Sequence, residues 1–181
     1  DKIIDSIRSV CMDKYVPDMY QKSIYTIDYD LLYSRGIRCL LFDLDNTLVP
    51  ITENVPSDDV KELFDKLKDK GFKIIIFSNS LKKRVRPFKD ILEVDCCAFA
   101  CKPHPRKFLS IINIYGLKFS EIAIIGDSMM DDIVCGNTIG ITTILLDQID
   151  KREFPIARLK RIKEKKRIRR IDDFIREWRN R

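Results

Sequence analysis

Short, continuous runs of apolar residues recur along the middle of the chain, separated by stretches with helical spacing. Runs that are apolar at every position are typical of strands buried on both faces of a sheet. We predict five such strands, over 38–42, 72–77, 96–100, 122–126 and 142–147. Strands that alternate with helices favour a doubly wound (Rossmann-like) parallel α/β sheet, which is the predicted fold class.

One helix is predicted over 57–70, between the first two strands. Its apolar residues recur at i, i+3, i+4 and i+7, which places them on one face: Val60, Leu63, Phe64 and Leu67. Ser57 or Asp58 can cap the first turn, and Gly71 can end the helix.

Two further helices are predicted later in the chain. One covers 105–115 and stops at Gly116, with three residues facing the core: Phe108, Leu109 and Ile112. The other begins near Asp131 and ends by Gly140.

Charged residues are unevenly distributed along the chain. Residues 151–181 contain 14 Lys and Arg against 5 Asp and Glu, a net charge of +9, whereas residues 1–150 have a net charge of −3. We predict an amphipathic segment over 1–36 packed on the core, a folded core over 37–150 and a basic helical tail over 151–181. Such a tail favours an anionic partner, which could be nucleic acid, anionic lipid or an acidic surface.

Composition indicates a cytoplasmic protein. No apolar stretch approaches the ~18 residues of a membrane-spanning helix, and the first residues lack the apolar centre of a signal peptide. The six cysteines form no spaced framework, which favours reduced thiols. Cys97, Cys101 and His104 are candidate zinc ligands, but structural zinc usually takes four ligands, so core packing is the favoured interpretation.

Polar side chains follow the predicted strands. CLLFDLDNTLVP (39–50) places Asp43 and Asp45 just after an apolar run, on the same side of an extended backbone. FSNS (77–80), CKPHP (101–105) and IIGDSMMDD (124–132) follow the same rule. The carboxyl ends of parallel strands share one edge, where ligands bind. We therefore expect five residues to converge there: Asp43, Asp45, Ser78, Lys102 and Asp127.

Several carboxylates at one edge would repel each other, since two unit charges about 4 Å apart cost about 4 kcal/mol at an effective dielectric near 20. A divalent cation relieves this repulsion, and oxygen ligands favour Mg²⁺. Lys102 and the donors around Ser78 would then hold an anionic substrate such as phosphate.

Each of these residues also has a purely structural interpretation. Asp43 and Asp45 can cap a turn, Ser78 and Asn79 can be turn residues, and Lys102 can be a solvated loop lysine. Acids such as those in the DD pair at 131–132 are also favoured at the start of a helix.

The motifs together resemble a known superfamily. DLDNTLV resembles the DxDx[TV] signature of haloacid dehalogenase (HAD) phosphohydrolases, and SNS, KP and GDSMMDD resemble the second to fourth motifs in order. The resemblance spans residues 37–147 and implies the HAD-type sheet topology.

The resemblance also implies catalytic roles. Asp43 would be the nucleophile that forms an aspartyl-phosphate, and Asp45 would be the general acid and base. Lys102 would offset charge between nucleophile and phosphate, and Thr47 would orient the acid. The implied phosphate-binding residues are Thr47, Ser78, Asn79 and Lys102.

A Mg²⁺ site is implied as well. Its ligands would be Asp43, the backbone carbonyl of Asp45, Asp127 and Asp132. Asp131 is the second choice for the last position.

No large cap domain is expected. Only 30 residues separate Thr47 from Ser78, and 23 separate Ser78 from Lys102. Neither gap can hold a folded domain, so the site should be open to a bulky substrate: a lipid head group, a nucleic-acid end or a phosphoprotein.

A narrower resemblance concerns nearly the whole chain. YVPDMYQKSIYTIDYDLLYSRGIRCLLFDLDNTLV and GDSMMDDIVCGNTIG are similar to the YqeG-type phosphatases of HAD subclass IIIA. That family is related to mitochondrial phosphatidylglycerophosphate phosphatases, which implies this phospholipid as a candidate substrate.

The flanking segments fit an enzyme that is peripheral on the inner membrane surface. RIRRIDDFIREWRNR places four residues near one helical face, surrounded by arginines: Ile168, Ile171, Ile175 and Trp178. Such a helix can lie on an anionic membrane. Four N-terminal residues could extend that surface: Tyr15, Val16, Met19 and Tyr20. Alternatively, both segments pack on the core.

Two other functions are also compatible with the sequence. The tail could bind RNA or the ribosome through phosphate contacts, with strong salt dependence. The same catalytic chemistry could also act on a polynucleotide or a phosphoprotein.

Overall fold

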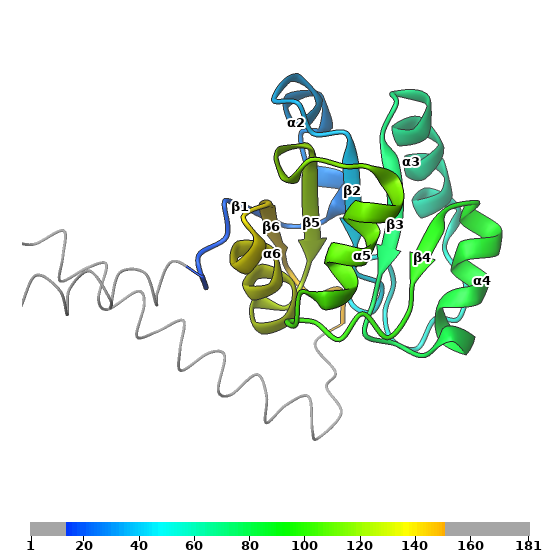
Figure 1. Cartoon of the computed structure of the whole chain (residues 1–181). Coiled ribbons are helices and arrows are strands. Elements are labelled where there is room, and N and C mark those ends of the chain that lie inside the picture. The colour runs from blue at the N-terminus through cyan, green and yellow to red at the C-terminus, as the bar shows by residue number, and fades with distance from the viewer. Residues whose placement is uncertain (1–13, 151–181) are drawn as a thin grey trace, which may run out of the picture. The chain divides into compact units, whose positions relative to one another are not determined.

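The computed structural model describes residues 14–150, which form a parallel α/β sheet with helices on both faces (Figure 1). All strand pairs are parallel, and the order across the sheet is β1-β6-β5-β2-β3-β4. The strands are β1 Met19–Gln21, β2 Cys39–Phe42, β3 Lys73–Phe77, β4 Asp95–Cys97, β5 Ile122–Gly126 and β6 Thr142–Leu146. The helices are α2 Tyr29–Ser34, α3 Asp58–Asp69, α4 Lys82–Leu92, α5 Arg106–Tyr115 and α6 Val134–Ile139, with the π-turn η3 Met129–Ile133 and the 3₁₀ turns η1 Ile24–Thr26 and η2 Phe119–Glu121.

Two apolar layers enclose the sheet. In β2, Leu40 and Phe42 belong to the cluster that includes residues of α2, α3 and α4. Cys39 and Leu41 alternate with them and belong to the cluster that includes residues of α5 and α6. Every residue of β2 is buried because a strand covered on both faces has no solvent side.

The carboxyl ends of the central strands meet at one edge of the sheet. The arrowheads of β3, β4 and β5 point to the lower edge of the molecule in Figure 1. Asp43 extends the pairing of β2 with β5, since its N–H donates to the carbonyl of Ile125 at 2.9 Å. The order of strands changes direction between β2 and β5, so this edge includes the switch point where α/β sheets bind ligands.

The sequence predictions of strands and helices agree closely with the structure in most places. The helix over 57–70 is α3, which starts at the cap Ser57 and is followed by Gly71 with φ of 98°. The helix expected near Asp131 is η3 continued by α6, and it ends at Gly140. The sheet is doubly wound, as predicted.

Two local predictions were wrong. Leu109 is 41% exposed rather than facing the core, because the buried positions of α5 are Phe108 and Ile111, three residues apart. The strand expected over 96–100 stops at Cys97, since β4 is an edge strand and the chain bends at 98–99, with Phe99 at a φ of 51°.

One strand and two α-helices were not predicted. β1 pairs with β6 at one edge of the sheet, α2 packs on the core through Leu32, and α4 fills the interval before β4. The boundaries at 36/37 and 150/151 remain predictions.

The four N-terminal residues that were predicted to extend a membrane surface differ in burial. Tyr15 is buried and Met19 packs against the core, whereas Val16 and Tyr20 are exposed. The predicted tail helix with Trp178 lies outside the described residues. Within 14–150, no helix combines the length and the apolar character needed to cross a bilayer.

Candidate active site

A buried lysine is the centre of the site. Lys102 Nζ donates to Asp43 Oδ1 and to Asp132 Oδ1, each at 2.6 Å. The side chains of Lys102 and Asp132 are 2% and 1% exposed, and that of Asp43 is 12% exposed. The predicted nucleophile, lysine and metal ligand are therefore one ion-paired group, and Lys102 is not a solvated loop residue.

The loop that carries Lys102 is held by Asn79. The Asn79 side-chain oxygen accepts from the N–H of Lys102 at 2.7 Å, and its amide nitrogen donates to the Lys102 carbonyl at 3.1 Å. The oxygen and the nitrogen of the Asn79 side chain thus both bond to the backbone of Lys102. Asn79 was predicted to bind phosphate, and this geometry also makes it a positioning residue for the lysine.

Asp127 follows β5 and faces Asp43. Thr47 donates to one carboxylate oxygen of Asp127 at 3.4 Å, and the side chain of Gln148 donates to the other at 2.8 Å. Gln148 was missed by sequence reasoning because its only local signal was a position just after the last strand.

Asp132 reaches the site through η3. The N–H of Ser128 donates to Asp132 Oδ2 at 3.1 Å. A Cβ on Gly126 would lie 2.1 Å from the same oxygen, so the close approach requires glycine at the end of β5. Asp131 is only half-buried and lies outside the carboxylate cluster, which supports the first choice of Asp132.

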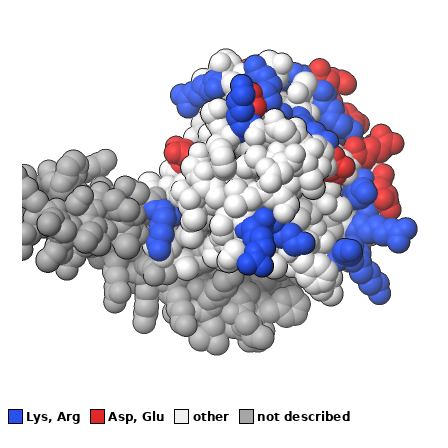
Figure 2. Space-filling model, viewed as in Figure 1, with Lys and Arg blue, Asp and Glu red and all other residues white. Residues whose placement is uncertain are grey.

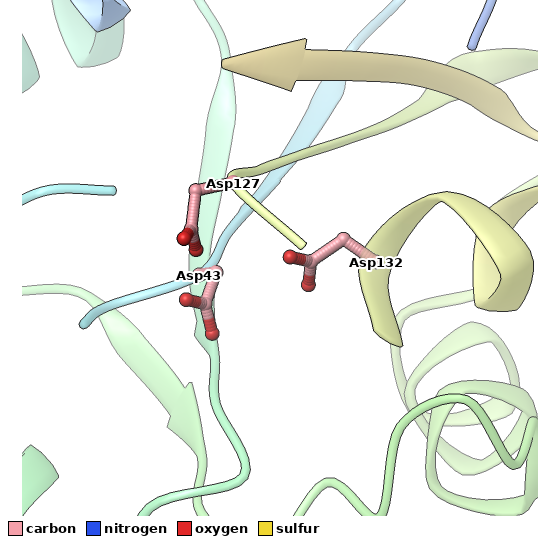
Figure 3. A group of neighbouring side chains, drawn as sticks. All are labelled: Asp43, Asp127 and Asp132. Carbon is pink, nitrogen blue, oxygen red and sulfur yellow. The ribbon is translucent and has the colours of Figure 1, made fainter. Parts of the chain in front are cut away.

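Three carboxylates form the cluster. Asp43, Asp127 and Asp132 each offer an oxygen within 4.8 Å of the others, and Figure 3 shows the carboxylate of Asp132 pointing toward the other two. Within residues 14–150, no other group of three His, Cys, Asp or Glu meets this criterion.

The donor set fits a hard divalent cation. Two aspartates share one lysine and Asp127 adds a third carboxylate beside them, so a surplus of negative charge remains in a poorly solvated place. Carboxylate oxygens are the ligands that Mg²⁺ prefers. Asp43, Asp127 and Asp132 would hold such an ion, with the backbone carbonyl of Asp45 as the further ligand that the sequence resemblance implied.

Burial shifts the acid–base equilibria of this group. Withdrawal from water raises the pKa of Asp43 to about 7, against the opposing charge of Lys102. Burial likewise raises the pKa of Asp132 to about 6. Burial would lower the pKa of Lys102, but the two carboxylates raise it above its ordinary value, so the lysine stays protonated.

Asp45 lies in a different environment, nearer to solvent. Its Oδ1 accepts from Nε and Nη2 of Arg84 at 3.0 and 2.8 Å, and its Oδ2 accepts from the hydroxyl of Ser80 at 2.5 Å. Arg84 Nη1 also donates to the carbonyl of Glu53, so this arginine joins α4 to the loop after β2. Ser80 and Arg84 were not predicted to lie in the site. The spacing of Val85, Phe88 and Leu92 is that of a buried helix face, and it could have revealed the helix that carries Arg84.

Ser78 and Asn46 complete the loops around the site. Ser78 is buried at the end of β3, and its hydroxyl accepts from the N–H of Ser80 at 3.1 Å. Asn46 has a φ of 64°, a left-handed conformation that asparagine tolerates better than most residues. The turn after β2 therefore brings both Asp45 and Thr47 back to the site.

A doubly wound sheet with aspartates and a lysine at these strand ends defines the class of haloacid dehalogenase-like hydrolases. A family model described as haloacid dehalogenase-like hydrolase matches residues 51–140, and one described as mitochondrial PGP phosphatase matches residues 5–90. The chain belongs to the haloacid dehalogenase-like hydrolases and is a phosphatase.

Within this class, the chain is similar to proteins called phosphatases. It is 30% identical over 152 residues to "Probable phosphatase YqeG" of Bacillus subtilis, covering 84% of this chain and 88% of that protein. It is 24% identical over 164 residues to "Phosphatidylglycerophosphate phosphatase 1, chloroplastic/mitochondrial" of Arabidopsis thaliana, covering 84% of this chain and 47% of that protein.

Solved structures support the fold. An uncharacterized protein from Listeria monocytogenes superimposes with a TM-score of 0.52 at 20% identity, covering 66% of this chain and 85% of that one. A predicted HAD-like family hydrolase from Porphyromonas gingivalis also gives 0.52, at 14% identity, covering 70% and 98%.

Proposed function

We propose that the protein is a Mg²⁺-dependent phosphomonoester hydrolase that acts through an aspartyl-phosphate on phosphatidylglycerophosphate. The observation that carries the chemistry is the convergence of Asp43, Asp127 and Asp132 around Lys102. The lipid is supported by the match to a PGP phosphatase family model over residues 5–90.

In the first step, an oxygen of Asp43 attacks phosphorus and the bond from phosphorus to the leaving oxygen breaks. Asp45 must be protonated in the substrate complex, and it gives that proton to the leaving oxygen. Lys102 holds Asp43 at 2.6 Å and reduces repulsion between the attacking carboxylate and the phosphoryl oxygens.

In the second step, water attacks phosphorus and gives a proton to Asp45, and the bond between Asp43 and phosphorus breaks to release inorganic phosphate. Ser78 and its neighbouring backbone hold the transferring group. Bound Mg²⁺ would offset the charge of the phosphoryl oxygens.

The surroundings of the site are consistent with a large substrate. The chain between Thr47 and Ser78 is used by α3 and β3, and the chain between Ser78 and Lys102 by α4 and β4. Neither described interval contains a cap domain. A phosphomonoester on a lipid could reach Asp43 while the rest of the molecule stays outside.

The test measures phosphate release from phosphatidylglycerophosphate in mixed micelles and from a soluble aryl phosphate. We expect both activities with Mg²⁺, loss in EDTA and recovery when Mg²⁺ is restored. Asp43→Asn should abolish both, whereas Asp131→Asn, outside the carboxylate cluster, should retain them. Activity of Asp43→Asn would refute the nucleophile. Hydrolysis of the aryl phosphate without hydrolysis of the lipid would refute the substrate.

A further inference from the structure

Exposed apolar side chains surround the opening of the active site. They lie on loops that follow β2, β3, β4 and β6, the same edge of the sheet that carries the catalytic residues. We call these residues the apolar rim, and each is between 36% and 60% exposed: Ile51, Val55, Leu81, Phe99 and Ile149. Single exposed apolar residues are common on protein surfaces, but several that gather at one edge are typical of an interaction site.

The rim borders an open cleft next to the catalytic loop. The cleft has a volume of about 400 Å³ and is lined by Val55 and Ile149 from the rim, together with Thr47, Leu48 and Val49. Thr47 also donates to Asp127, so the cleft directly adjoins the carboxylate cluster.

Cationic side chains stand beside the rim. We call the exposed residues Lys82, Lys83 and Arg86 of α4, with Arg106 and Lys107 of α5, the basic edge. Figure 2 shows Lys and Arg gathered over α4 and over the beginning of α5. Leu81 immediately precedes Lys82 and Lys83, so the apolar rim and the basic edge meet at the start of α4.

This combination fits a bilayer better than a nucleic acid. Four of the five rim residues are aliphatic and cannot stack on bases as aromatic side chains do. Aliphatic groups that enter the interfacial region beside cations that meet lipid phosphates are the usual features of a peripheral membrane surface. The acids Glu53, Asp58 and Asp59 are exposed on the α3 side of the opening. On α4, Asp90 pairs with Arg86, so the attraction comes mainly from Lys82, Lys83 and the cations of α5.

We propose that the apolar rim and the basic edge are a docking face for an anionic phospholipid bilayer, with the active site directed at the head groups. The proposal rests on the proposed function only for the identity of the lipid that is hydrolysed. Lys102 and Asp43 lie beneath this face, nearly excluded from solvent, so a phosphate must be brought to them.

The decisive variant combines Leu81→Ser, Lys82→Glu and Lys83→Glu. Leu81 is the N-cap of α4 and makes no side-chain cap, so serine can supply one. Acids in the first turn of a helix are favoured by its dipole. The variant should therefore fold at least as well as the original chain, and it changes no residue placed in the catalytic machinery.

A matched control makes the same chemical changes elsewhere. Phe119→Ser, Arg35→Glu and Lys118→Glu replace one exposed apolar residue and two exposed cations. These residues lie before β2 and β5, at the amino ends of the strands, opposite the active site. Both variants keep residues 151–181, so any contribution of the basic tail is common to them.

Binding is measured by co-sedimentation with vesicles of phosphatidylcholine, with or without phosphatidylglycerol, and by fluorescence anisotropy with a single-stranded RNA oligonucleotide. We expect the original chain and the control to bind only the phosphatidylglycerol vesicles, and the Leu81 triple variant to bind at least 10-fold more weakly. Its hydrolysis of phosphatidylglycerophosphate in vesicles should fall to the same extent, while its hydrolysis of an aryl phosphate stays within twofold.

Equal vesicle binding by all three proteins, or an equal loss in the control, would overturn the docking face. Binding to RNA but not to vesicles would overturn it in favour of a nucleic-acid surface. A protein that shows the expected vesicle binding but hydrolyses no phosphomonoester would refute the proposed function and leave the docking face intact.

Discussion

The two halves of the site hold their carboxylates in different ways. In the buried half, Asp43 and Asp132 share Lys102, and all three side chains are at most 12% exposed. In the open half, Asp45 is held by Arg84 and Ser80, with the ion-paired side chains 24% and 17% exposed. A nucleophile needs one fixed position, whereas a group that exchanges protons with a leaving group and with water needs access to both.

The difference also concerns charge. The open half pairs one carboxylate with one arginine, whereas the buried half and Asp127 together hold three carboxylates and a single lysine. Only the second arrangement has charge left for a metal to neutralise. Changes in the buried half should therefore affect both stability and activity, whereas changes in the open half should affect mainly activity.

The largest effect should come from Lys102→Met. It removes the cation shared by Asp43 and Asp132 and leaves both carboxylates unpaired in a buried place. We expect kcat/KM for an aryl phosphate to fall ~1000-fold, and the free energy of unfolding to fall by about 3 kcal/mol in EDTA. Lys118→Met, at the opposite edge of the sheet, is the control. A loss of less than 10-fold in kcat/KM would remove Lys102 from the catalytic centre.

Asp132→Asn and Asp131→Asn distinguish neighbouring acids. Asp132 belongs to the carboxylate cluster and Asp131 does not, so only the first change removes a candidate ligand. We expect the Mg²⁺ concentration for half-maximal activity to rise ~100-fold for Asp132→Asn, within the range for loss of a metal-supporting group, and to stay within threefold for Asp131→Asn. The reverse order would assign the metal to Asp131.

The pH dependence of stability should report the surplus charge directly. In the metal-free protein, burial raises the pKa of Asp43 to about 7 and that of Asp132 to about 6, above the values near 4 of an unfolded aspartate. The folded state then binds more protons than the unfolded state between these values, so stability is greatest at low pH in this window and is lost as pH rises through 7.

We expect the free energy of unfolding in EDTA to decrease by about 4 kcal/mol between pH 5 and pH 8. Urea unfolding curves at both pH values measure this change. Asp43→Asn should reduce the slope, and saturating Mg²⁺ should reverse it because the ion favours the ionised carboxylates. Increasing stability over the same range without metal would contradict the shifted pKa values.

The smallest effect should come from the open half. Arg84→Met removes the two hydrogen bonds to Asp45 Oδ1 and the link to the loop at Glu53. Because these groups are partly solvated, we expect a stability change below about 1 kcal/mol, with kcat reduced about 10-fold for an aryl phosphate. Arg86→Met, also on α4 but exposed, should change neither value. A loss as large as that of Lys102→Met would end the distinction between the two halves.

Much of the fold and site could be read from local pattern. Apolar runs placed β2, β3, β5 and β6 within one residue of their observed ends. Of the polar residues expected to meet beyond them, Asp43, Lys102 and Asp127 lie together in the structure. The failures have local causes. α4 contains Pro87 and four basic residues in its first turns, which obscured its buried face, and Leu109 occupies a helical position that the neighbouring Phe108 and Ile111 make external.

Sequence alone thus determined the alternating α/β order, the edge of the sheet that carries the site, and the aspartates and lysine at that edge. It could do so because a buried strand and the polar residues that follow it are recognisable within a stretch of a few residues. Tertiary structure alone decided that Asp132 rather than Asp131 joins the cluster, that Asn79 holds the backbone of Lys102, and that Arg84 and Gln148 reach Asp45 and Asp127. These contacts join residues 21 to 39 positions apart or depend on which side of a single turn is buried, and no short stretch of sequence records either.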